Sequence, residues 1–466
     1  MTLPDIFEVN TRLIMGDEMY RRFREALDEE ASVSIRINRK KCNTAANNAE
    51  SVPWCENGYY MKNRPNFTFD PFLHSGWYYV QEASSMFIHR VISQYVKKPS
   101  DMLDLCAAPG GKSTAAIAAL PEGSTLMSNE PMKPRAQILA ENISKWGYSN
   151  VIVTNNFPKD YVASGLSFDV ILCDVPCSGE GMFRKDNAAI EEWSVRNVEQ
   201  CSRLQREIVA SAWQCLRPGG ILIYSTCTFN TKEDEENIRH FCNEYGAEVL
   251  PVDTEGSWGI QGSLLDGFDA PVYRFIPGCT KGEGLFLAVL KKDDDAPITA
   301  KRDKAQALNK KRNKSAESHS IKPSDFLKGN YNTRTSGDEI WALPESICNL
   351  YDFASSRLHI LSAGVAVGRI KGRDIIPCQA LALSTDLRRE AFHCVELDYC
   401  QAIDYLRKEA ITLPESTPKG IVLVTYRNAV LGFMKNIGNR ANNLYPQEWK
   451  IKSTHVPYAA PDIIKV

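Results

Sequence analysis

The chain has 466 residues, too many for one hydrophobic core, and this length favours about two to four domains. Its 43% hydrophobic and 24% charged residues are typical of a soluble globular protein, and no apolar run reaches the roughly 20 residues that cross a bilayer. The net charge of −2 excludes no nucleic-acid partner, because only the surface beside the nucleic acid must be basic.

The 14 cysteines are scattered along a long chain, which favours reduced thiols over a disulfide framework. No CxxC pair occurs and no histidines stand at metal-ligand spacing beside a cysteine, so no metal site is expected. The opening residues MTLPD lack the basic and apolar segments of a signal peptide. We therefore expect a cytoplasmic protein without membrane association.

Residues 1–77 predict an α+β region. Residues 1–30 favour helix, since 18–29 are rich in Arg, Glu, Met and Leu with few breakers. Residues 32–38 (SVSIRIN) alternate polar and apolar side chains, which is typical of a half-buried strand.

From 78 to 295, short apolar runs alternate with helical segments. Helices are expected at 113–120 and 134–146, and the apolar runs predict strands at 102–105, 125–127, 151–153, 170–173 and 221–224. Continuously apolar strands separated by helices indicate a parallel sheet that is covered on both faces.

The remainder of the chain predicts a linker and two smaller units. Residues 296–320 form a basic linker; its run 301–314 (KRDKAQALNKKRNK) is either solvated or in contact with phosphates, and the sequence leaves both open. A connecting domain is expected at 321–390. The β-branched runs at 421–426 and 429–434, joined by a tight turn, predict a small β-barrel that ends near residue 452.

The segment CAAPGGK (106–112) joins a predicted strand to a predicted helix. Its small residues allow close approach of a ligand to the backbone, and a helix N-terminus offers unpaired amides, although many glycine-rich turns only shape the chain. Glu130 follows the next strand, where a carboxylate can accept hydrogen bonds from ribose hydroxyls or merely cap a helix. The loop and the acid together favour a nucleoside cofactor.

Two further predicted strands end in cysteines. Asp174 and Cys177 follow the strand at 170–173, and Cys227 follows the strand at 221–224, so all three should meet at one sheet edge. This set suits methylation of carbon 5 of cytosine: a thiolate adds to carbon 6, an acid assists at the ring, and a base later removes a proton. Other cysteines are interpreted as small buried hydrophobes: Cys106, Cys173, Cys201, Cys215 and Cys242.

The motifs CAAPGGK (106–112), DVPCSGEGMFRKD (174–186) and YSTCTFNTKEDEEN (224–237) resemble the Sun/RsmF family of RNA cytosine-5 methyltransferases. Residues 79–86 resemble the family's segment before the cofactor loop, and 35–38 resemble its N-terminal RNA-binding strand. Residues from 321 onward are similar to the connecting domain and PUA-type barrel of the bacterial RsmF branch.

The resemblance implies an α/β fold with a Rossmann-like S-adenosylmethionine-dependent methyltransferase core at 78–295. The core would be flanked by an N-terminal RNA-binding α+β region at 1–77 and by the linker at 296–320. The connecting domain at 321–390 and a PUA-like RNA-binding barrel at 391–466 would follow.

The resemblance also implies residue roles. Cys227 would be the nucleophile, and Cys177 would assist product release. Asp174 would contact the target base and Lys112 would line the site. S-adenosylmethionine would contact Cys106, Ala107, Ala108, Pro109, Gly110, Gly111, Lys112, Glu130, Asn155 and Asp174. The implied substrate is 16S rRNA, alone or in the small ribosomal subunit.

Three other functions compete with this one. DNA cytosine-5 methyltransferases place the nucleophile in the PC motif and need no TC cysteine, so Cys227 argues against them. A non-catalytic RNA-binding ribosome assembly factor would not need both cysteines and Asp174. A tRNA cytosine-5 methyltransferase remains open, because PUA-type modules serve either RNA.

Overall fold

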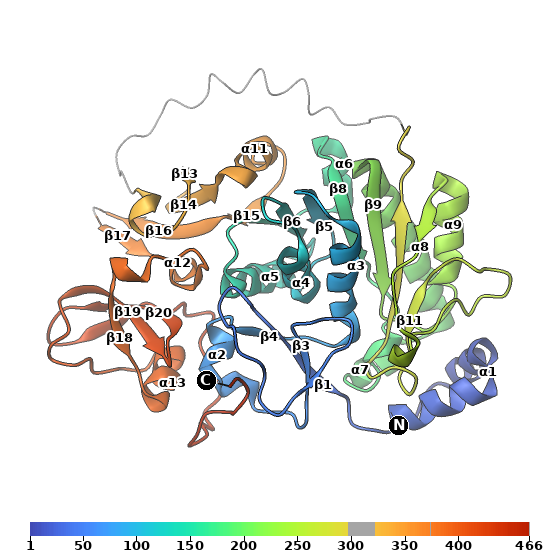
Figure 1. The fold of residues 1–466 in the computed structure, drawn as a ribbon, viewed down its shortest axis with the longest axis horizontal. Coiled ribbons are helices and arrows are strands. Elements are labelled where there is room, and N and C mark those ends of the chain that lie inside the picture. The colour runs from blue at the N-terminus through green and yellow to red at the C-terminus, as the bar shows by residue number, and fades with distance from the viewer. Residues whose placement is uncertain (297–321, 373, 466) are drawn as a thin grey trace.

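The computed structural model describes residues 1–296, 322–372 and 374–465 (Figure 1). The basic run at 301–314 and nearly all of the predicted linker lie outside these ranges. None of the helices in the described ranges is both long and apolar enough to cross a membrane.

A mixed sheet of nine strands forms the centre of the described chain. Its order is β10-β12-β9-β8-β5-β6-β7-β15, and β11 pairs with β12. The five inner strands are parallel and confirm the predicted Rossmann-like core: β5 (Asp101–Asp104), β6 (Thr125–Asn129), β7 (Val151–Thr154), β8 (Phe168–Asp174) and β9 (Leu216–Thr226).

Helices cover both faces of the sheet because the inner strands are apolar on both sides. Met102 and Ile221 pack in one core cluster, whereas their neighbours Leu103 and Leu222 pack in another on the opposite face. The first face carries α3 (Phe87–Tyr95), α4 (Gly111–Ala119) and α5 (Lys133–Trp146); the second carries α6 (Pro158–Ser164), α8 (Val195–Cys215), α9 (Glu235–Tyr245) and α11 (Glu345–Ala354).

The sheet edges differ from the predicted all-parallel arrangement. On one side β12 (Leu285–Lys291) runs antiparallel to β9 and carries β10 (Glu248–Leu250) and β11 (Tyr273–Phe275). On the other side β15 (Ile360–Ala363) runs antiparallel to β7. An apolar run does not encode strand direction, which depends on the length and path of the connection. Because β15 lies within 321–390, that region shares the central sheet.

The N-terminal region contains a kinked helix and a small antiparallel sheet. In α1 (Asp5–Leu27) the kink is at Gly16, whose φ is +72°, and the sheet order is β2-β3-β1-β4. The predicted strand at 32–38 is β1 (Val33–Ile37), which pairs with β4 (Tyr78–Val80), so this sheet extends past residue 77. The sheet is completed by β2 (Glu50–Ser51) and β3 (Gly58–Met61), and α2 (Pro71–His74) lies before β4.

Arg36 on β1 is not a surface residue. Its guanidinium is buried, donates to Gln81 Oε1 at 2.8 Å and to Thr114 Oγ1 at 2.5 Å, and lies over the Trp146 ring. These contacts join the N-terminal sheet to α4 and α5. The polar side of this strand, which carries Arg36, therefore faces α4 and α5 of the core.

The C-terminal part contains two further sheets, at the orange-to-red end of the chain in Figure 1. The first has the order β13-β14-β16-β17, with β13 (Tyr331–Ser336), β14 (Glu339–Pro344), β16 (Val365–Lys371) and β17 (Asp374–Pro377), followed by α12 (Gln379–Leu383). The second, in the PUA-like part, consists of β18 (His393–Glu396), β19 (Gly420–Tyr426), β20 (Ala429–Asn436) and β21 (Ala441–Asn443), with α13 (Tyr399–Arg407).

The chain continues past residue 452 and returns to the N-terminal region. Ile464 forms a β-bridge with Ala46, and the amide of Asn47 donates to the carbonyl of Ile463 at 2.8 Å. Ile463 and Ile464 are buried in a cluster that also contains Ile35 and Val424. The PUA-like part is thus attached to the N-terminal sheet by shared apolar packing.

Helix α1 packs on the loops that follow β8 and β9 through an aromatic cluster in which Phe23 contacts Phe229 with ring centroids 4.9 Å apart. We expect Phe23→Ala to lower the free energy of unfolding by about 3–5 kcal/mol, because it leaves a cavity at a fully buried site. Leu13→Ala, on the same helix and 79% exposed, should change it by less than about 0.5 kcal/mol. Urea unfolding measures the free energy of unfolding of both variants. An equally small loss in both would show that α1 does not pack on these loops through Phe23.

Candidate active site

A cavity of about 170 Å³ opens at the carboxyl edge of the parallel strands. Loop residues 106–109, 111 and 112 line most of it, together with Asp104 from β5 and Asp174 from β8. Residues 79–82 and Ser85 close the other side. The sheet topology therefore brings the predicted glycine loop and Asp174 to one site, as parallel strands require.

Side chains hold the loop at 106–112 by its carbonyl groups. Asn142 Nδ2 donates to the carbonyl of Pro109 at 2.8 Å, and Arg135 Nη2 donates to that of Ala108 at 2.9 Å. Gly110 has φ +110°, a left-handed conformation that a residue with a Cβ would adopt only under strain. This arrangement keeps the open N-terminal turn of α4 directed at the cavity, where its amides can meet a ligand.

Asp104 is a site residue that the sequence analysis missed. It is fully buried, its Oδ2 accepts from Ser113 Oγ at 2.6 Å, and its Oδ1 has no hydrogen-bond partner. Burial raises the pKa of Asp104 to about 7, and the nearby charge of Asp174 adds to the shift. The available signal was its position, an acid that ends an apolar strand directly before the loop. A cationic ligand group would satisfy the free oxygen.

Lys112 and Asp174 form an ion pair inside the site. Lys112 Nζ lies 2.9 Å from Asp174 Oδ2, and Ser225 Oγ donates to Asp174 Oδ1 at 2.7 Å. Burial lowers the pKa of Lys112, but the charge and hydrogen bond of Asp174 outweigh it, so the pKa is raised. Lys112 is therefore a cation that helps to orient the carboxylate.

The two cysteines of the PC and TC motifs lie side by side. The Sγ atoms of Cys177 and Cys227 are 3.0 Å apart, both side chains are free and half-buried, and the amide of Cys227 donates to Cys177 Sγ at 3.4 Å. The hydrogen bond with Cys227, followed by burial, raises the pKa of Cys177 well above its usual value. As long as the Cys227 sulfur carries no bond to a substrate, Cys177 is thus a protonated thiol at neutral pH.

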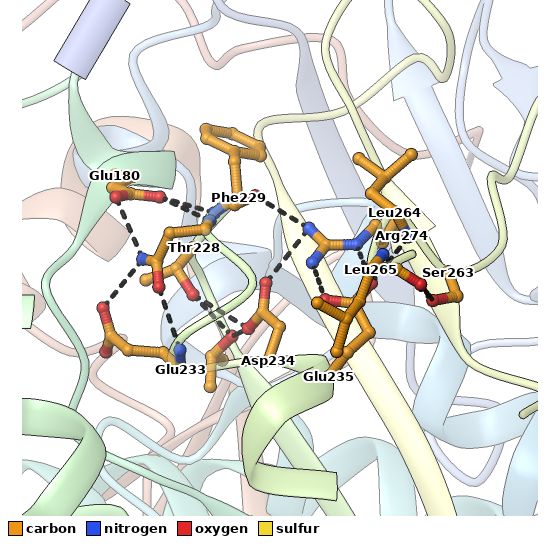
Figure 2. Close-up of polar contacts among 12 residues, drawn as sticks. Glu180, Thr228, Phe229, Glu233, Asp234, Glu235, Ser263, Leu264, Leu265 and Arg274 are labelled. Carbon is orange, nitrogen blue, oxygen red and sulfur yellow. Dashed lines mark hydrogen bonds and ion pairs between the residues drawn. The ribbon is translucent and has the colours of Figure 1, made fainter. Parts of the chain in front are cut away.

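The loops that carry the cysteines are tied together by a buried carboxylate (Figure 2). Glu180 Oε2 accepts from the amides of Phe229 at 2.6 Å and Asn230 at 3.1 Å. The amide of Gly181 donates to the carbonyl of Cys227 at 2.8 Å. The loop after β8 therefore positions the residues after Cys227 as well as Cys177.

A second buried cluster flanks Cys227 on the other side, and the sequence analysis missed it. Asp234 Oδ1 accepts from the hydroxyls of Thr226 at 2.6 Å and Thr228 at 3.0 Å, the two neighbours of Cys227 (Figure 2). Arg274, fully buried, lies 3.1 Å from Asp234 Oδ2 and also pairs with Glu235. The acidic run 233–236 was visible in the sequence, but nothing there linked it to a distant arginine.

Glu130 and Asn155 do not border the cavity of 170 Å³. Glu130 is buried directly after β6, and its Oε1 accepts from the amide of Met132 at 3.0 Å. Asn155 Nδ2 donates to the carbonyl of Glu130 at 2.8 Å, whereas Asn156 is bonded through both side-chain atoms to the backbone of His359. The cofactor roles of Glu130 and Asn155 remain predictions.

Comparison with protein families matches three parts of the chain. Residues 95–291 match 16S rRNA methyltransferase RsmB/F, residues 3–83 match the N-terminal domain of 16S rRNA methyltransferase RsmF, and residues 392–451 match the methyltransferase RsmF PUA domain. The three matches correspond to the central core, the N-terminal region and the PUA-like part of the structure, respectively.

Individual relatives span almost the whole chain. Ribosomal RNA small subunit methyltransferase F of Shewanella loihica is 30% identical over 448 residues, covering 89% of this chain and 88% of the relative. The protein of that name from Escherichia coli O9:H4 is 31% identical over 470 residues and covers 96% of each chain.

Solved structures from Pyrococcus horikoshii share the fold. A methyltransferase homolog has a TM-score of 0.52 at 24% identity and covers 62% of this chain and 100% of its own. NSun6 has a TM-score of 0.52 at 21% identity and covers 62% and 98%.

The raised pKa of Asp104 predicts a pH-dependent stability. The carboxyl loses its proton near pH 4 when unfolded and near pH 7 when folded, so its contribution is complete below about 4 and is lost as the pH rises through about 7. Relative to Asp104→Asn, the protein should lose up to about 1.4 kcal/mol per pH unit in that window. Urea unfolding across the window measures this; Asp266→Asn, at an exposed carboxyl, is the matched control. A pH-independent difference between Asp104→Asn and the native protein would contradict the assignment.

Proposed function

This chain belongs to the RsmF family of 16S rRNA methyltransferases, and we propose that it methylates carbon 5 of a cytosine in 16S rRNA with S-adenosylmethionine. The observation that supports this most is the pair of cysteine sulfurs, 3.0 Å apart, on the loops after β8 and β9. An enzyme that forms a bond between one cysteine sulfur and the base can use the second thiol to assist the breaking of that bond.

The residues around the cavity fit S-adenosylmethionine, which supplies an electrophilic methyl group when bound. The unpartnered Oδ1 of buried Asp104 suits its ammonium group, and the small residues of 106–111 leave room for close backbone contact. Glu130 and Asn155, on the far side of the loop, are proposed contacts for the ribose and the adenine. Lys112 and Asp174 would separate this pocket from the target base.

Cys227 would act on the cytosine first. Its thiolate adds to carbon 6, forming a carbon–sulfur bond while the electron pair of the C5–C6 double bond shifts through carbon 5 to ring nitrogen 3, which takes up a proton. The Asp174 carboxyl group, held by Lys112 and Ser225, would pass a proton to ring nitrogen 3 of the flipped-out base and accept a hydrogen bond from its exocyclic amine. Carbon 5 then becomes nucleophilic enough to be methylated.

Cys177 would act in the second half of the reaction. The hydrogen bond with Cys227 is the largest cause of its raised pKa, and that bond is lost once the Cys227 sulfur is joined to carbon 6. Cys177 then ionises more easily and, as or near the base, assists removal of the proton from carbon 5. The double bond re-forms and the thiolate of Cys227 is expelled.

The RNA partner is proposed to be 16S rRNA, by itself or in the small ribosomal subunit. The names of the relatives support this choice over tRNA. The sequence predicts a cytoplasmic protein, and a bacterial enzyme would encounter ribosomal RNA in that compartment.

The division of labour between the cysteines is testable with a denaturing gel and labelled 16S rRNA. With Cys177→Ala we expect a slow-migrating protein–RNA adduct, because addition proceeds and elimination stalls. With Cys227→Ala we expect neither adduct nor methylation. An adduct only with Cys227→Ala would make Cys177 the nucleophile, and no adduct or methyl transfer with any form, on rRNA or tRNA, would favour a non-catalytic binding protein.

Cofactor contacts are testable by calorimetry with S-adenosylmethionine. Glu130→Ala and Asp104→Asn should each weaken binding about tenfold or more, since a buried polar contact left unpaired costs about 1–3 kcal/mol. Glu122→Ala, at an exposed carboxylate in the turn before β6 and thus at the opposite sheet edge, is the matched control and should bind normally. Unchanged affinity in either test variant removes that residue from the cofactor site.

A further inference from the structure

A second cavity, of about 180 Å³, lies where the N-terminal, connecting and PUA-like parts meet. Lys40 and Lys41 come from the segment after β1, Lys328 and Arg389 from the connecting domain, and Trp77 from the position directly before β4. Four cations line this cavity and none of its lining residues is acidic.

The ammonium group of Lys41 is held by two backbone carbonyl groups. Its Nζ donates to the carbonyls of Ser75 at 2.9 Å and Lys145 at 2.6 Å, which leaves the third ammonium hydrogen for another acceptor. A Cβ on Gly147 would lie 2.9 Å from this nitrogen, and one on Gly76 would lie 3.1 Å from it. Two glycines with positive φ thus let the backbone close around the buried ammonium.

The other cations of the cavity are not neutralised by the protein. Lys328 and Arg389 are exposed and have no acidic partner within the described ranges, and Lys40 lies over the Tyr148 ring at 4.3 Å. Glu390, next to Arg389, and Asp325, near Lys328, are exposed and do not line the cavity. Asp386 accepts from the hydroxyls of Ser149 and Tyr331. Burial also lowers the pKa of Lys41 to about 7, a loss of charge that a bound anion would reverse.

We propose that this cavity binds a backbone phosphate of the RNA substrate, a step that rests on the proposed RNA function. Several cations from separate elements match the several oxygens of one phosphate. A single extended segment connects the two sites, since Trp77, directly before β4, borders this cavity and Gln81, directly after β4, borders the cofactor cavity. The four residue steps between them span roughly 13 Å, a distance that a few nucleotides of RNA can cover.

The test compares variants in filter binding to a 16S rRNA transcript as salt is raised. Lys328→Gln with Arg389→Gln removes two exposed cations, and Lys97→Gln with Lys98→Gln removes two exposed cations at the opposite sheet edge as the matched control. The first pair should weaken binding about tenfold and reduce the salt slope by about 0.7–0.9, the value for one phosphate, whereas the control pair should change neither.

In a second comparison, Lys41→Met is added to the surface pair Lys328→Gln and Arg389→Gln to give a triple variant. If Lys41 and the surface pair hold the same phosphate, the triple variant should bind RNA no more than about twofold more weakly than the surface pair alone. Cofactor affinity, measured by calorimetry, should be unchanged in all of these variants. Equal RNA affinity and slope in the surface pair and its control would overturn the proposal.

Inorganic phosphate at matched ionic strength separates the two sources of the anion. If it raises the melting temperature of the native protein but not of the surface pair, while RNA affinity equals the control, the cavity is a free-anion site and the proposal fails. Binding is measured without methyl transfer, so a slope difference in a protein that methylates no rRNA supports this cavity and refutes only the proposed reaction.

Discussion

The geometry of the reactive loops depends on one buried counter-charge, the guanidinium of Arg274. It lies 3.1 Å from Asp234 Oδ2 and pairs with Glu235, and both acids are fully buried. Burial raises the pKa of Asp234 well above its usual value, although the charge of Arg274 opposes that shift. Asp234 in turn binds the hydroxyls of Thr226 and Thr228 on either side of Cys227. Removing the arginine would leave the two buried acids without their cation, so this contact helps to hold the TC loop in position.

A buried ion cluster adds little to the free energy of unfolding, because the desolvation of the charges offsets much of their attraction. Here the cluster fixes the position of the residues on either side of Cys227. Glu180 repeats the pattern on the loop after β8, where it accepts hydrogen bonds from the amides of Phe229 and Asn230. Two loops from different strands are therefore held with their sulfurs 3.0 Å apart by directional bonds rather than by apolar packing alone.

The sequence predicted the parts of the site that follow from strand position. Parallel strands end at one edge, so Asp174 and the glycine loop had to share a site once β5 and β8 were identified. Arg274 was not predictable, because its partners lie 39 and 40 residues away and pair only through the antiparallel β11–β12 edge. Asp104 was visible at the end of its strand, but its unpartnered oxygen exists only in the packed structure. The strand at 35–38 resembles an RNA-binding strand, but its charged residue Arg36 is buried against Trp146.

The same limit applies to the domain boundaries. An apolar tetrapeptide such as Ile360–Ala363 carries no sign that it will become the outer strand of a sheet built some 200 residues earlier, yet β15 pairs with β7 and brings α11 onto the second face of the core. The C-terminal tail returns to the N-terminal sheet through Ile463 and Ile464. Cutting the chain at residue 320 would therefore expose the edge of β7 and part of two cores. The proposed phosphate cavity and the central sheet are consequently parts of one packed structure, so that a half-buried cation such as Lys41 is positioned by contacts with the backbone beside the core.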